Sequence, residues 1–171
     1  MADLLEALVQ IKALAETPPR VAELLRLAPP DAWRRRPEQG VWTPVEVLAH
    51  LADAELFFGT RTRLVLTSER PFLQPFQGAV LAELAGYNSW PPAVAFERFR
   101  SRRVETLELL SSCSAAGLAR VGVHPVRGET SVADLVALAL AHDTDHVGQM
   151  RERLGIAVAL DRGEAEAVWR R

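Results

Sequence analysis

The segment Thr43-Pro44-Val45-Glu46-Val47-Leu48-Ala49-His50 carries three agreeing signals that a long helix begins there. Threonine is a preferred N-cap, proline suits the first helical position, and a glutamate three residues after the cap completes a capping box. The apolar spacing that follows predicts a helix to about Ser68. The sequence therefore places His50 early on a long amphipathic helix.

On that helix His50 is predicted to point with the apolar stripe of Val47, Ala54 and Phe57, and not with Arg61 and Arg63. A histidine on an apolar face is either a hydrogen-bonded core residue or a ligand.

Three more long helices are predicted on either side of this one. Helical spacing or start signals place them over residues 2–16, continued from an N-cap at Thr17 to about 27, over 90–114, and over 130–154. Residues 70–90 contain prolines and glycines with no long period, so we expect a crossover with a short helical piece near 79–85. No strand alternation is found. The prediction is an all-α, four-helix bundle in a single domain 1–171, with its core at about 2–154 and a C-terminal tail at 155–171.

Composition excludes several classes of protein. The chain has 171 residues, a formal net charge of −2 and no apolar run near the ~20 residues that span a bilayer, so neither nucleic acid nor a membrane is expected as a partner. The arginines at 98, 100, 102 and 103 are expected on solvated faces with local ion pairs. The lone Cys113 excludes an internal disulfide. Acidic residues near Met1, where a secretory signal carries basic ones, favour a cytoplasmic location.

Three of the four histidines lie in predicted helices. His142 and His146 are four residues apart and share a face, so together they can hold one metal ion, and His50 on another helix can complete the site. The alternative is a set of hydrogen-bonded core histidines, and spacing alone leaves both open. His124 precedes a proline in a predicted loop and is interpreted as a surface or packing residue.

Acidic residues accompany the histidines. Asp145 and Asp53 each lie three residues from a histidine, and either can orient an imidazole, act as a further ligand or be a plain helix carboxylate. The order His142-Asp143-Thr144-Asp145-His146 resembles the zincin His-Glu-x-x-His pattern, with Asp143 as the general base. Without a Glu-x-x-His unit, a di-iron bundle is excluded.

The order of motifs resembles the DinB/YfiT-like superfamily. The matching stretches are Trp42-Thr43-Pro44-Val45-Glu46-Val47-Leu48-Ala49-His50-Leu51, then His124-Pro125 with Gly128-Glu129-Thr130, then Ala141-His142-Asp143 with His146 and Gln149. The resemblance implies an up-down-down-up bundle with the long crossover between helices 2 and 3. It also implies a divalent metal ion, nickel or zinc, held by His50, His142 and His146, and a homodimer.

Some members of this family resemble thiol S-transferases that use bacillithiol, mycothiol or glutathione. We therefore expect metal activation of a low-molecular-weight thiol that attacks a small-molecule substrate, in detoxification or stress response, with Asp145 and Asp143 as candidate catalytic residues. One alternative is a metal-dependent hydrolase in which either aspartate is the base. A non-catalytic bundle that binds metal or small molecules is the other.

Overall fold

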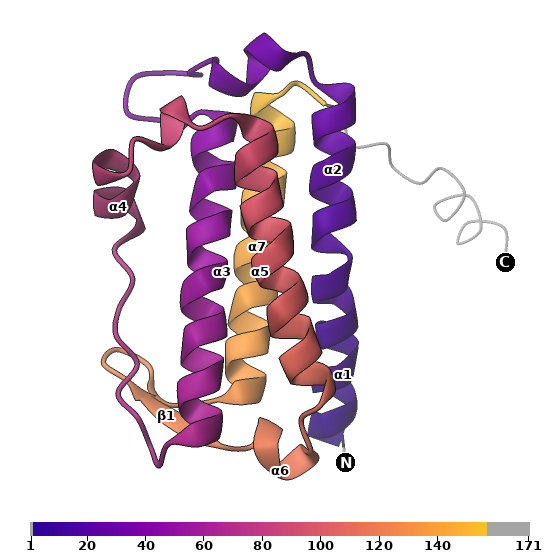
Figure 1. Ribbon diagram of the computed structural model, residues 1–171, viewed down its shortest axis with the longest axis vertical. Helices are drawn as coiled ribbons and strands as arrows, with labels where there is room; N and C mark the ends of the chain where they lie inside the picture. The colour runs from indigo at the N-terminus through magenta and orange to yellow at the C-terminus, as the bar shows by residue number, and fades with distance from the viewer. Residues whose placement is uncertain (1, 157–171) are drawn as a thin grey trace, which may run out of the picture.

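The computed structural model describes residues 2–156 of the chain (Figure 1). Four helical columns form the bundle that the sequence predicts, so the all-α fold class is confirmed. They are α1 (Ala2–Ala15) with α2 (Thr17–Leu27), α3 (Pro44–Thr67), α5 (Pro92–Ser111) and α7 (Val132–Arg153). The short elements are η1 (Pro30–Arg34), α4 (Gly78–Leu84), η2 (Tyr87–Ser89), α6 (Ala115–Leu118), β1 (Val121–His124) and β2 (Gly128–Ser131). No helix within 2–156 is long and apolar enough to cross a bilayer. The predicted tail beyond 156 lies outside the described residues.

The helix starts at α3 and α7 are set by capping boxes. Thr43 Oγ1 accepts from the N–H of Glu46, and the Glu46 carboxylate accepts from the N–H of Thr43 at 2.6 Å. Ser131 and Asp134 form the same reciprocal pair at the start of α7. The sequence prediction for α3 is confirmed, and the two starts fix where the histidines fall along their helices.

The predicted N-cap at Thr17 is wrong. Glu16 occupies the cap position with helical φ and ψ of −83° and −13°, and its side chain makes no capping bond. The N–H of Arg20 donates to Glu16 O across the junction. Proline is tolerated in a first helical turn, so α1 and α2 stack into one nearly continuous column.

Helices α3 and α5 run in the same direction. Two ion pairs show this, since Asp53 pairs with Arg102 and the later residue Arg63 pairs with the later residue Glu105. In Figure 1 both descend, and the crossover returns the chain to the start of α5 along the outside of the bundle. The short helix expected within it is α4.

The structure contains a β-hairpin where the sequence predicts no strand. Strands β1 and β2 pair antiparallel from Val121 opposite Ser131 to His124 opposite Gly128, and Gly128 adopts a φ of +75° at the turn. Val123 exchanges backbone hydrogen bonds with the crossover, donating to Pro71 O at 2.8 Å and accepting from the N–H of Leu73 at 2.9 Å. The hairpin thus fixes the beginning of the crossover.

Side chains hold the rest of the crossover against α3. Arg61 donates to Gln74 O, and the Tyr87 hydroxyl donates to Asp53 at 2.7 Å. The prediction that Arg61 points away from the face of His50 is wrong. Arg61 follows His50 by eleven residues, which is close to three full helical turns, so both residues lie on the same face of α3. The crossover therefore lies over the α3 face that carries His50.

Two apolar core clusters, one around Trp33 and Phe99 and one around Leu14 and Leu135, meet at a buried cation. Arg103 is 1% exposed and packs over the Phe99 ring, with Cζ 5.0 Å from its centroid. The sequence predicts a solvated face with local ion pairs for this residue, and for Arg103 that prediction is wrong. Its ion-pair partners come from other helices, Glu55 from α3 and Asp143 from α7, so the side chain points into the bundle.

Candidate metal centre

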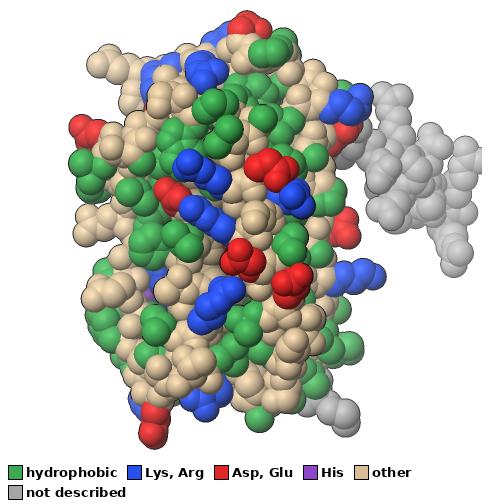
Figure 2. Space-filling view, in the orientation of Figure 1, with side chains coloured by type: hydrophobic (Ala, Val, Ile, Leu, Met, Phe, Trp, Pro, Cys, Tyr) green, Lys and Arg blue, Asp and Glu red, His purple; other side chains and the backbone are tan. Residues whose placement is uncertain are grey.

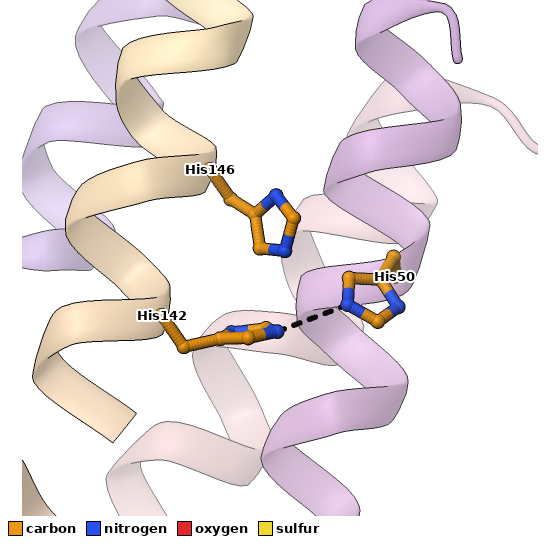
Figure 3. A group of neighbouring side chains, drawn as sticks. All are labelled: His50, His142 and His146. Atoms are coloured by element: carbon orange, nitrogen blue, oxygen red, sulfur yellow. Dashed lines mark hydrogen bonds between the residues drawn. The ribbon is translucent and has the colours of Figure 1, made fainter. Parts of the chain in front are cut away.

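His50 from α3 and His142 and His146 from α7 converge (Figure 3). Their potential ligand nitrogens all lie within 4.8 Å of one another, and His50 Nε2 is 3.0 Å from His142 Nε2. The three imidazoles singled out by the sequence therefore share one place in the bundle.

The surroundings keep these imidazoles neutral. Burial, followed by the charge of His146, lowers the pKa of His50 to about 4. Burial and the two neighbouring histidines lower the pKa of His142 to about 3, and burial also lowers the pKa of His146. A neutral imidazole has one nitrogen lone pair, and clustering such lone pairs away from water is unfavourable without a partner. A divalent cation is the partner that three converging lone pairs suit.

Gln149 orients one of the rings. Its Oε1 lies 3.1 Å from His146 Nδ1, so an Nδ1–H donates to the amide and the Nε2 lone pair is left for the cluster. His50 Nδ1 and His142 Nδ1 are buried and make no hydrogen bond within the described chain. This role of Gln149 is not among the sequence predictions, although its spacing of three residues from His146 is a signal for it.

Aromatic rings and one glycine enclose His50. Trp42 and Phe76 flank it at ring-centroid distances of 5.0 and 5.4 Å. A Cβ added at Gly78 would lie 2.5 Å from His50 Cε1, so the backbone of α4 packs directly on the ring. The crossover thus supplies part of the wall of the cluster.

The predicted acidic residues do not face the imidazoles. Asp143 is buried and both its oxygens accept from Arg103, at 2.6 and 3.1 Å. Asp53 accepts from Tyr87 and Arg102, so it holds the crossover and does not orient His50. Asp145 is exposed, and its charge raises the pKa of His146. This arrangement argues against the zincin-like interpretation of Asp143, because the guanidinium of Arg103 holds that carboxylate in a buried ion pair.

The remaining candidates lie elsewhere. His124 Nδ1 accepts from the backbone N–H groups of Val126 and Arg127, at 3.2 and 3.3 Å, and stabilises the hairpin turn. Cys113 is half-buried, and burial raises its thiol pKa, which disfavours the thiolate.

The chain is similar to several known proteins. Residues 13–150 match the family model of the DinB superfamily. A protein of Bacillus mycoides strain KBAB4 named "Putative metal-dependent hydrolase" is 30% identical over 118 residues, 67% of this chain and 68% of its own length. A protein of Oceanobacillus iheyensis with the same description is 27% identical over 65% of this chain and 64% of its own.

Among solved structures, YfiT from Bacillus subtilis superimposes with a TM-score of 0.77 at 21% identity, over 88% of this chain and 89% of its own. Its structure is described as "a probable metal-dependent hydrolase with an unusual four-helix bundle topology". At this identity the likeness supports the fold.

Proposed function

This chain belongs to the DinB superfamily, and from that membership we propose that it is a metal-dependent hydrolase of small molecules with His50, His142 and His146 as its metal ligands. The observation that carries the proposal is the convergence of three neutral imidazoles with no carboxylate among the clustered ligand groups found within residues 2–156. Three neutral ligands leave coordination positions open, which suits catalysis better than a structural role. The relatives named as metal-dependent hydrolases support the reaction class.

A divalent ion such as zinc or nickel supplies Lewis-acid activation of water at such a site. In the hydrolysis of an ester or amide, the water oxygen bonds to the acyl carbon, the bond to the leaving group breaks, and a proton of the water passes to the leaving group. The chain's own part is to hold the imidazoles. Gln149 fixes the tautomer of His146, while Trp42 and Phe76 exclude solvent from the ring of His50.

One observation favours a second candidate, the transfer of a low-molecular-weight thiol such as bacillithiol or mycothiol. Asp143 is bound by Arg103 and Asp145 is exposed, so no carboxylate within the described chain is held against the imidazoles as a base. A thiol with a pKa of ~8.5 needs far less assistance to lose its proton than water, whose pKa is about 15.7. Thiol transfer therefore suits a site without a base.

The shared premise is tested by the metal content of protein purified without a histidine tag. We expect the wild type to hold one divalent ion per chain and His142→Ala to lose it. His124→Ala is the matched control, because that histidine lies in the hairpin and should leave the metal content unchanged. Wild-type protein that takes up no divalent ion would overturn both candidates.

The metal-loaded protein should then be assayed on a panel of small esters and amides, with and without added thiols. Turnover that needs no thiol supports the hydrolase. Turnover that depends on a thiol, with the thiol incorporated into the product, would replace it with the transferase.

A further inference from the structure

A fourth polar side chain continues the histidine face of α7. His142, His146, Gln149 and Arg153 are spaced by four, three and four residues, so all four lie on one stripe of the helix. At 1.5 Å per residue, the backbone of Arg153 lies about 10 Å from that of His146 along the helix axis. The guanidinium is therefore at the end of the stripe, within a small molecule's length of the cluster.

Within residues 2–156, Arg153 is a half-buried cation without an anion. Its Nη1 is buried and has no hydrogen-bond partner, and no carboxylate in residues 2–156 forms an ion pair with it. Two other enclosed arginines differ, since Arg102 is paired with Asp53 and Arg103 with Glu55 and Asp143. Removing part of a guanidinium from water without a compensating anion is costly, so a bound anion at this place would be stabilised.

Trp42, which precedes α3, lies beside the histidines, with its ring centroid 5.0 Å from that of His50. An aromatic surface thus borders the cluster.

We propose that Arg153 binds a carboxylate of the substrate while the reacting group lies at the histidine cluster. The substrate class is then a small carboxylic acid with an apolar middle portion that packs on Trp42. One guanidinium matches the single charge and two oxygens of a carboxylate, whereas a phosphate dianion would leave one charge uncompensated in a half-buried place. The identity of the group that reacts at the histidine cluster rests on the proposed function, whereas the binding of a carboxylate by Arg153 does not.

The test measures binding of benzoate, with neutral benzamide as its isostere, by calorimetry. The protein is stripped of metal and kept in chelator, so that the carboxylate cannot bind a metal ion. We expect benzoate to bind the wild type at least tenfold more tightly than benzamide. In Arg153→Gln this preference is lost, and in Arg153→Lys it is partly kept. Arg100→Gln is the matched control, because this exposed arginine lies on α5 and is paired with Glu97.

Equal binding of benzoate and benzamide by the wild type, or an unchanged preference in Arg153→Gln, would overturn the proposal and leave Arg153 as a cation at a helix C-terminus. Tighter binding of phenyl phosphate than of benzoate would overturn the assignment to a carboxylate. If Arg153→Gln does not fold, the wild-type preference and the lysine variant decide. Because metal is absent throughout, a failed metal assay and a failed carboxylate site are distinguishable.

Discussion

Replacement of Arg103 by methionine is expected to be the most damaging single polar change in the bundle. Its guanidinium donates to Leu14 O at 3.0 Å, to Glu55 at 2.6 Å and to Asp143 at 2.6 and 3.1 Å, with 1% of the side chain exposed. Burial lowers the pKa of Arg103, but the charges of Glu55 and Asp143 outweigh it and the net pKa is raised. Methionine keeps an apolar stem and leaves two buried carboxylates without a cation.

Breaking a buried pair from one side costs about 3–5 kcal/mol, a large share of the ~5–15 kcal/mol that stabilises a typical domain. For a domain of this size, that corresponds to a decrease in Tm of roughly 6–20 °C. Thermal and urea unfolding followed by circular dichroism measure the loss.

Arg100→Met is the matched control, because Arg100 lies on the same helix in an exposed pair with Glu97, and the loss of an exposed pair should leave the stability nearly unchanged. Adding Glu55→Gln and Asp143→Asn to Arg103→Met should recover part of the stability, since the uncompensated charges are removed. Equal stabilities of Arg103→Met and Arg100→Met would refute the reasoning.

Three further predictions concern the cluster. Gly78→Ala places a Cβ 2.5 Å from His50 Cε1 and should weaken metal binding about 10–100-fold, whereas Gly148→Ala, with nothing within 4 Å, should not. Metal-free protein should keep its full stability above pH 6.5 and become less stable as the pH falls toward 4, because the lowered pKa values of His50 and His142 mean that the unfolded chain binds protons before the folded chain does. His50 alone accounts for about 3 kcal/mol of this loss. A urea midpoint that does not change across this pH range would contradict the assignment. Gln149→Leu should weaken metal binding more than Gln149→Glu, which keeps an acceptor for His146 Nδ1; equal affinities would exclude the orienting role.

The parts of the fold that follow from neighbouring residues were predictable. The start of α3 follows from Thr43, Pro44 and Glu46, which are neighbours in the chain, and the pairing of His142 with His146 follows from helical periodicity. The association of His50 with that pair needed one further inference, that both helices face the same core.

The parts that depend on distant residues were not predictable. Arg103 is buried with Glu55 and Asp143, which lie 48 and 40 residues away in the chain. The residues next to Arg103 in the sequence do not distinguish it from an exposed arginine. The strands of the hairpin are four residues long, and β1 also pairs with the crossover at residues 71–73. The need for glycine at 78 exists only because α4 lies on the ring of His50.

The buried ion pairs and the histidine cluster constrain the same helix. Consecutive residues of a helix are rotated by about 100°, so His142 faces His50 on α3 while Asp143 faces Arg103 on α5. A rotation of α7 about its axis would therefore break both contacts. We expect Arg103→Met to lose metal affinity along with stability, whereas Gly78→Ala should lose affinity with its folding intact. An Arg103→Met variant with wild-type metal affinity would show that the walls of the cluster position the imidazoles without the ion pairs.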